Sequence, residues 1–225
     1  MGLKETVERQ LAPRLHEMAP GLTGAFVREA LSRAIDGVGP LAPAAVAADK
    51  QLREQRGNVE RAIHEVIENN VRLAGAQGFA TNVGGMITMA ITIPANVTGL
   101  AVLQCRMVAG IAHLRGHDLA DPRVRNAILT LLLGEEQVHE LVSKRKLPST
   151  PVAIATAPVH DPTIDGSISA VVATDIVTRI AGKRLATTLG RKIPLVGGVV
   201  GMGADGYATW RIGRYADREL LPRRR

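Results

Sequence analysis

Hydrophobic positions recur at helical spacing along most of the chain. Residues 3–18 and 22–37 are predicted to form two amphipathic helices, separated by Pro20-Gly21. A third helix is predicted over residues 59–76, with Asn58 as its N-cap. Its apolar side chains share one face and its other face is charged, so we expect this helix to lie at a surface.

The same spacing continues in the second half of the chain. Asp121 followed by Pro122 is typical of an N-cap with proline at the first helical position, and predicts a helix that runs to about Lys146. Residues 147–162 are rich in proline and are predicted to form an extended loop. Two more helices are predicted, over residues 167–189 and 197–221.

A break of glycine and proline, Gly37-Val-Gly-Pro-Leu-Ala-Pro43, separates the first helices from the rest. It predicts an N-terminal helical extension, residues 1–48. Residues 49–225 would then form the main helical domain, which ends in a basic tail.

The strongest signal is the run from Leu73 to Leu114, in which Arg106 is the one ionised side chain. The run is long enough to span a bilayer. Gly75, Gly78, Gly84, Gly85 and Pro94 interrupt it, and Pro94 should end or kink a helix. A buried helical hairpin fits it about as well as a membrane span. The low mean hydropathy of the chain, +0.08, favours the globular or interfacial interpretation.

Composition narrows the fold class. The chain is 46% apolar but has only five aromatic residues, so its core must be built from small and aliphatic side chains. This favours closely packed helices. We predict an all-α protein, a multi-helix bundle with a central Gly/Ala-rich apolar helical hairpin. A single cysteine, Cys105, excludes an internal disulfide. The N-terminus lacks a secretory signal, so we expect a cytoplasmic protein.

The net charge of +7 arises entirely after residue 121, where 16 basic side chains face 9 acidic ones. Basic clusters beside apolar helices suit an anionic membrane surface. The predicted membrane-surface residues are Lys183, Arg184, Arg191, Lys192, Arg211 and Arg214. Nucleic acid is an unlikely partner, because the chain has no nucleic-acid-binding motif and few aromatics for base stacking.

One stripe of the apolar run mixes small, polar and cationic groups: Asn96, Gly99, Leu103, Arg106, Gly110, His113 and His117. A buried cation needs a partner. Asp205 is the only ionised residue between Ile193 and Trp210, and we predict that it pairs with Arg106. The candidate ligand or structural polar site is therefore Arg106, Asp205, Asn96 and His113. The alternative is that Arg106 reaches solvent and Asp205 caps a local turn.

Glycines at a spacing of four allow close helix packing, as Gly197 and Gly201 do here. No strand precedes these glycines and no phosphate-loop lysine follows, so close packing is favoured over a ligand cradle. The predicted helix-packing glycines are Gly84, Gly85, Gly197, Gly198 and Gly201.

No catalytic residue and no cofactor are predicted. Glu136 and His139 have the spacing used by di-iron bundles, but a second copy of that motif is missing. His64 could add a third metal ligand, but a histidine on a solvated, charged helix face is the better explanation of this residue. These three residues are weak metal candidates.

Several segments together resemble the EcsC family of bacterial proteins. The resemblance rests on Leu73-Ala-Gly-Ala-Gln-Gly-Phe79, Ile93-Pro-Ala-Asn-Val-Thr-Gly99, Leu103-Gln-Cys-Arg-Met-Val-Ala109, Ile193-Pro-Leu-Val-Gly-Gly-Val-Val-Gly201 and Arg211-Ile-Gly-Arg-Tyr-Ala216, and covers about residues 55–218. This sequence departs from the family pattern at Asn96, where many relatives carry Asp, and its loop 147–162 has no clear counterpart in the family. The resemblance implies a helical fold and a connection with membranes and ABC transporters, without an established activity.

Three functions are compatible with these features. The leading one is a non-enzymatic protein peripheral to the inner membrane, which binds an anionic membrane surface, a lipid or another hydrophobic ligand, as an accessory to an ABC transporter. The second is an interaction subunit that docks on a transporter or on its own copy. The third is a metal-dependent enzyme built on Glu136, His139 and His64.

Overall fold

The computed structural model describes residues 24–83, 95–189 and 194–223, with side chains described for 24–76, 99–179 and 203–223. This part of the chain is all helical and contains no strand. Its helices are α2 (Gly24–Asp36), α3 (Ala44–Glu54), α4 (Val59–Val83), α5 (Ala95–Leu114), α6 (Pro122–Leu131), α7 (Glu135–Ser143), α8 (Pro151–Ala155), α9 (Thr163–Leu189) and α10 (Pro194–Glu219). The predicted all-α bundle is confirmed. The predicted helix 3–18 lies outside the described residues.

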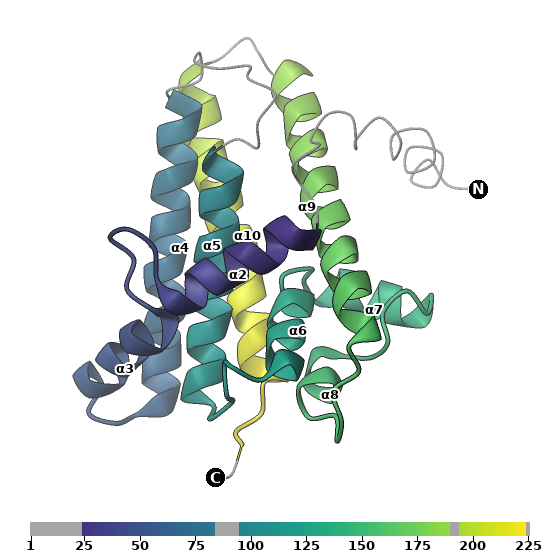
Figure 1. Ribbon diagram of the computed structural model, residues 1–225. Coiled ribbons are helices and arrows are strands. Elements are labelled where there is room, and N and C mark those ends of the chain that lie inside the picture. The colour runs from purple at the N-terminus through teal and green to yellow at the C-terminus, as the bar shows by residue number, and fades with distance from the viewer. Residues whose placement is uncertain (1–23, 84–94, 190–193, 224–225) are drawn as a thin grey trace.

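Helix α5 is the centre of the bundle, and contacts α2, α3, α4, α6 and α10 (Figure 1). Its described side chains from Ala101 to Ala112 are buried, with the single exception of the partly buried Arg106. Almost every position of α5 is apolar or small because neighbours cover it on all sides. No helix in the described part of the chain is both long and apolar enough to cross a membrane.

Helices α4, α5 and α10 run side by side, with α4 antiparallel to the other two (Figure 1). The apolar run of the sequence therefore forms the end of α4 and the whole of α5, packed as a helical hairpin. Glycines allow α10 to approach closely. A Cβ atom added at Gly213 would lie 3.0 Å from both Ile67 Cγ1 and Met107 Sδ.

Helix α2 lies across α5 and reaches α9 (Figure 1). Val27 and Leu31 of α2 are 1% exposed and belong to the same hydrophobic core as α5. Gly24 packs directly on Ser169 of α9. The described part of the predicted N-terminal extension is thus built into the common core.

Two predicted helix caps are confirmed. The Asn58 Oδ1 atom accepts a hydrogen bond from the backbone N–H of Arg61 at 2.9 Å, at the start of α4. Asp121 accepts one from the N–H of Arg123 at 2.9 Å, with Pro122 at the first position of α6. Both side chains bind amide groups that the first helical turn leaves without a partner.

The predicted helix from Asp121 to Lys146 is wrong, because the chain turns between α6 and α7. Gly134 adopts a φ of +83°, a conformation that glycine reaches without a Cβ clash. Helix α7 then starts with Glu135 and Glu136 in its first turn, where carboxylates interact favourably with the helix dipole.

Two other segments differ from the prediction. The loop 147–162 contains the short helix α8, which Pro151 begins after Thr150. Residues 44–54, for which no helix was predicted, form α3 after the predicted break. Three long helices also have other limits than predicted: α4 continues beyond residue 76 to Val83, while α9 and α10 begin earlier, at Thr163 and Pro194.

Candidate functional site

Gln104 and Arg106 lie on opposite sides of α5. The Nε2 atom of Gln104 donates to Thr209 Oγ1 at 3.2 Å, which directs this side of α5 toward α10. Arg106 follows two residues later, about 200° around the helix. Its side chain therefore points away from α10 and toward α3 and α4.

Arg106 binds backbone and amide oxygens. Its Nε atom donates to the carbonyl oxygen of Ala42 at 3.0 Å, and its Nη1 atom lies 3.5 Å from Asn70 Oδ1. Burial lowers the pKa of the Arg106 guanidinium below its ordinary value. Asp205 is 3% exposed on α10, and no ion pair joins it to Arg106 among the described contacts. The structure does not bring these two residues together, because Arg106 lies on the other side of α5.

A small cavity of about 80 Å³ lies beside Arg106, where α3, α4 and α5 meet. Small residues of α3 and α5 leave the space, and polar side chains surround it. The lining consists of Ala44, Ala47, Ala48, Gln51, Val66, Asn69, Asn70, Arg106 and Gly110. We call this cavity with its lining the Arg106 niche.

The predicted stripe of α5 does share one face. Gly110 lines the niche with Arg106, and His113, two turns after Arg106, bonds Asp49 of α3 through Nε2 at 2.8 Å. The side chain of Asn96 lies outside the described residues. His117 follows the end of α5, is 3% exposed, and its Nε2 atom lies 3.0 Å from the Leu221 carbonyl oxygen. Burial lowers the pKa of His117.

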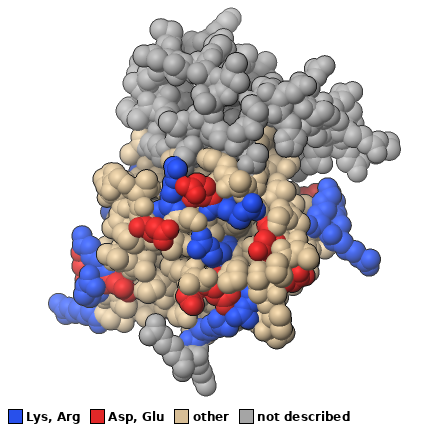
Figure 2. Space-filling view, viewed as in Figure 1, with Lys and Arg blue, Asp and Glu red and all other residues tan. Residues whose placement is uncertain are grey.

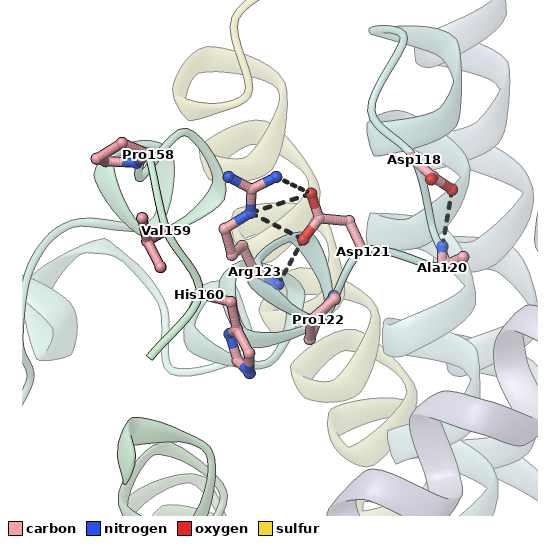
Figure 3. Close-up of a pocket in the computed structure, with 8 residues that line it drawn as sticks. All are labelled: Asp118, Ala120, Asp121, Pro122, Arg123, Pro158, Val159 and His160. Carbon is pink, nitrogen blue, oxygen red and sulfur yellow. Dashed lines mark hydrogen bonds and ion pairs between the residues drawn. The ribbon is translucent and has the colours of Figure 1, made fainter. Parts of the chain in front are cut away.

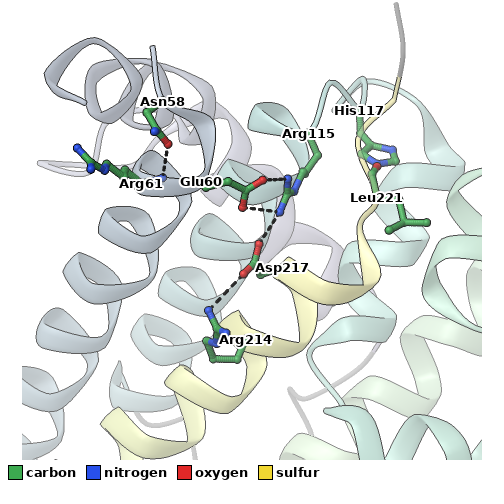
Figure 4. Close-up of polar contacts among 8 residues, drawn as sticks. All are labelled: Asn58, Glu60, Arg61, Arg115, His117, Arg214, Asp217 and Leu221. Atoms are coloured by element: carbon green, nitrogen blue, oxygen red, sulfur yellow. Dashed lines mark hydrogen bonds and ion pairs between the residues drawn. The ribbon is translucent and has the colours of Figure 1, made fainter. Parts of the chain in front are cut away.

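An ion-pair cluster joins α4, the end of α5 and α10 (Figure 4). Arg115 is 9% exposed and binds Glu60 at 2.5 Å and Asp217 at 2.7 Å. Asp217 also accepts from Arg214 at 3.3 Å. Burial by itself lowers the pKa of Arg115, but the hydrogen bonds and charges of Glu60 and Asp217 together outweigh it and raise the pKa. Sequence reasoning missed this cluster, because its members are far apart in the chain and each belongs to an ordinary charged face.

Helix α7 is tied to α10 by two further ion pairs. Arg211 binds Glu136 at 2.9 Å, and Arg218 binds Glu135. The predicted membrane-surface residues Arg211 and Arg214 are thus exposed but paired with carboxylates. The side chains of Lys183, Arg184, Arg191 and Lys192, the other four, lie outside the described residues.

The metal candidates do not come together. Within the described residues, no group of three or more His, Cys, Asp or Glu side chains is close enough to hold a metal ion. Glu136 binds Arg211, and His64 pairs with Glu68 at 2.9 Å on the exposed face of α4.

An open hollow of about 540 Å³ lies at the start of α6 (Figure 3). Arg123 binds Asp121 at 2.6 Å and also donates to the Ala157 carbonyl. Hydrogen bonding to Arg123 is the main cause that lowers the pKa of Asp121. Asp118 accepts from the N–H of Ala120, and His160 pairs with Asp165. Because Arg123 binds both Asp121 and the Ala157 carbonyl, this hollow is a junction between α6 and the segment after α8.

The side-chain surroundings of the predicted packing glycines are outside the described part of the structure. Gly84 and Gly85 are outside the described residues, and Gly197, Gly198 and Gly201 belong to the backbone of α10 without described surroundings. Other glycines make close approaches between described helices. Besides Gly24, they include Gly213, against Ile67 and Met107, and Gly110, whose added Cβ would lie 3.3 Å from Val66 Cγ1.

Charge is distributed unequally between the two ends of the bundle. Helix α4 has no charged residue after Arg72, α5 none before Arg106, and α10 none before Asp205. Helix α9 has no acidic residue after Asp175 but carries Arg179, Lys183 and Arg184. These segments meet at one end of the molecule (Figure 1). We call it the acid-free end; it comprises residues 73–83, 95–105, 176–189 and 194–204.

The described part of one face of the molecule has mixed charge. Figure 2 shows Lys and Arg side chains interspersed with Asp and Glu over the described part of the face in view. The opposite end of α4, α5 and α10 contains the cluster around Arg115 and the α7 ion pairs. We call it the ion-paired end; its residues are Glu60, Arg115, Glu135, Glu136, Arg211, Arg214, Asp217 and Arg218.

Comparison with known proteins gives one match. The model of the EcsC protein family matches residues 22–224, from just before α2 to beyond α10, and so includes every described helix. The match starts earlier than the resemblance over residues 55–218 and includes the segment 147–162. Searches of curated proteins and of solved structures found no match.

Proposed function

The chain belongs to the EcsC protein family, and from this premise we propose that it is a non-enzymatic protein that docks with its acid-free end on an anionic membrane surface. The observation that carries the proposal is the charge distribution. Two stretches without acidic residues, 69–117 and 176–204, are far apart in the sequence. The acid-free end contains residues 73–83 and 95–105 from the first stretch and residues 176–189 and 194–204 from the second, which the fold places at the same end of the bundle (Figure 1).

An anionic surface attracts a protein end that has cations and no carboxylates. Each Lys or Arg near such a surface contributes about 1 kcal/mol. Lys183 and Arg184 are in the last two turns of α9, and Arg191 and Lys192 are in the four-residue connection to α10. Lys183 and Arg184 therefore supply an attraction at this end that distant carboxylates of the bundle do not cancel, because the field is screened within about 10 Å.

The apolar helix ends supply a second contribution. The charge-free parts of α4, α5 and α10 carry aliphatic residues and glycine, and interfacial protein segments bury their apolar side chains about 5–10 Å into the headgroup boundary. Insertion to that depth would keep Lys183 and Arg184 at headgroup level, since Lys183 is six residues, or about 9 Å, from the end of α9.

Vesicle flotation with charge-reversal variants tests the proposal. The wild-type protein should float with phosphatidylcholine vesicles that contain phosphatidylglycerol, and less with pure phosphatidylcholine. The double variant Lys183→Glu/Arg184→Glu should lose roughly thirtyfold or more in affinity, because two contributions of about 1 kcal/mol each disappear.

The matched control is Lys144→Glu/Arg145→Glu, which changes the net charge equally at the end of α7. It should float like the wild type. A protein that ignores anionic vesicles contradicts the proposal, and equal losses in the two double variants would show that net charge, not the acid-free end, governs binding.

A second candidate function is self-association through α10. Tyr207 and Trp210 are 62% and 45% exposed, and their rings stack with centroids 6.0 Å apart. Exposed aromatic side chains are enriched at protein interfaces. In detergent-free buffer, mass measurement should give a dimer for the wild type and a monomer for Trp210→Ala. A wild-type monomer at high protein concentration contradicts this function.

A further inference from the structure

We propose that the Arg106 niche binds a small free oxyanion of about the size of inorganic phosphate. The niche joins a partly buried guanidinium, three amide side chains and a half-open space between α3, α4 and α5. This binding site does not depend on contact with a membrane.

The first argument is charge. The niche has one cation and no carboxylate in its lining. The acidic residues of the helices packed around it mostly pair elsewhere: Asp49 with His113, Glu54 with Lys50, Glu60 with Arg115, and Glu68 with Arg72. Glu65, on the next turn of α4, is not part of the lining either. A partly desolvated cation without a counter-ion is unfavourable, and a bound anion lowers that cost.

The second argument is hydrogen bonding. A guanidinium has five N–H donors in a planar fork that matches the oxygens of a phosphate or carboxylate. Arg106 uses Nε for the Ala42 carbonyl, and its Nη1 contact with Asn70 is long, at 3.5 Å. Gln51 and Asn69 bring further amide groups to the lining, from α3 and α4. The niche therefore has donors from three helices for one oxyanion.

The third argument is space. A single buried water needs about 10–15 Å³ of such a cavity, so 80 Å³ accommodates several waters or one small polyatomic anion. The space exists because Ala44, Ala47, Ala48 and Gly110 have small side chains or none. A larger aliphatic residue at Ala47, which lines the niche, would fill this space.

A purely structural role for Arg106 explains less. The bond from Nε to Ala42 ties the connection between α2 and α3 to the bundle. This bond uses one of five donors and needs neither the amide groups nor the cavity. The two roles differ in one measurable property, since only a binding site gives an effect that depends on the identity of the anion and saturates.

The test is a titration of the full chain with sodium phosphate at constant ionic strength, with chloride as the exchanged ion, followed by calorimetry and by thermal unfolding. Binding to the native state should raise the unfolding temperature and approach the logarithmic dependence on phosphate concentration that a single site gives. Arg106→Gln should weaken phosphate affinity at least tenfold. Arg72→Gln removes an exposed cation from α4 and should leave the affinity unchanged.

A second pair of variants keeps the test decisive if Arg106→Gln does not fold. Ala47→Leu fills the niche and leaves the guanidinium in place, and should abolish phosphate binding. Val46→Leu adds a methylene at the adjacent position, which is 53% exposed, and should have no effect. No saturable binding to the wild type, or equal affinity in Ala47→Leu and Val46→Leu, overturns the proposal.

Flotation separates free phosphate from lipid headgroups. Ala47→Leu should float with phosphatidylglycerol vesicles like the wild type, although it no longer binds inorganic phosphate. If it loses both, the niche binds a lipid phosphate and the proposal of a free oxyanion is wrong. The double variant Lys183→Glu/Arg184→Glu should behave in the opposite way, with vesicle binding lost and phosphate binding retained.

Discussion

The two ends of the bundle use charge in different ways. At the ion-paired end, Arg115 is 9% exposed between two carboxylates, and α7 is joined to α10 by two more ion pairs. At the acid-free end, the helices carry cations and no carboxylate. The basic residues of the ion-paired end hold helices together, and Arg179 of the acid-free end likewise binds Asp175 at 2.8 Å and the Leu133 carbonyl oxygen at 2.6 Å. The proposed function assigns contact with an external anion to Lys183 and Arg184 of that end.

The largest stability effect should come from the centre of the ion-paired end. Arg115→Met leaves Asp217, 15% exposed, without its nearest cation, and should lower the free energy of unfolding by about 3 kcal/mol. Arg218→Met removes an exposed ion pair with Glu135 and should cost less than about 1 kcal/mol. Urea denaturation measures both. Equal losses in the two variants would contradict the special role of Arg115.

The next effect concerns helix packing between the two ends. At Gly213, an added Cβ would lie 3.0 Å from Ile67 Cγ1 and Met107 Sδ, so Gly213→Ala should destabilise by about 1–3 kcal/mol. At Gly203, no atom lies within 4 Å of the added Cβ, and Gly203→Ala should be neutral or stabilise by up to about 1 kcal/mol. Thermal unfolding of the two variants compares a packed with an open glycine on the same helix. A neutral Gly213→Ala would mean that α10 can move away from α4.

The smallest effect is a pH dependence at the start of α6. Arg123 lowers the pKa of Asp121 in the folded protein. A lowered pKa contributes stability above the unfolded value near 3.9, and this contribution is lost as the pH falls through the folded value. Asp121→Asn keeps a good N-cap but removes the charge. At pH 7, the free energy of unfolding of this variant should be lower than that of the wild type by less than about 1 kcal/mol. Below pH 4, its free energy of unfolding should fall less than that of the wild type.

Glu29→Gln is the control for this pH dependence, because Glu29 forms an exposed ion pair with Arg33 in α2. Its stability should follow the wild-type curve through acid pH. If Asp121→Asn follows the wild-type curve as well, the lowered pKa of Asp121 has no bearing on stability.

Local features of the sequence predicted much of the fold. Asn58 and Asp121 act as caps within three residues of the groups they bind, so their role can be read from the sequence alone. The break at Gly134 was missed because the apolar spacing continues through it, and only its positive φ reveals the turn. Helix α3 was missed because its buried positions, Ala44 and Ala48, are alanines that give a weak periodic signal.

The candidate site was predicted in part. The stripe that contains Arg106, Gly110 and His113 does form one face, since its members meet α3 and α4. The partners of Arg106 could not be predicted, because they are a backbone carbonyl oxygen and a side-chain amide oxygen. Neither gives a pattern in the sequence. The predicted pair of Arg106 and Asp205 did not take the helix rotation into account. Gln104 faces α10, and Arg106, two residues later, lies on the other side of α5.

The central claim is that the acid-free end, and not the side of the bundle, meets the membrane. Trp210 is the only tryptophan and lies 16 residues after the start of α10, about 24 Å along its axis. With the proposed insertion of this end by about 5–10 Å, Trp210 should stay in water when the protein binds vesicles.

The direct measurement is tryptophan emission with anionic vesicles that contain brominated lipids. The wild type should float with the vesicles while its emission is neither blue-shifted nor quenched. Leu195→Trp in a Trp210→Phe background, with its reporter in the first turn of α10, should show both a blue shift and quenching. Quenching of Trp210 together with an unchanged Leu195→Trp signal would contradict the account, because the side of α10 would then face the bilayer.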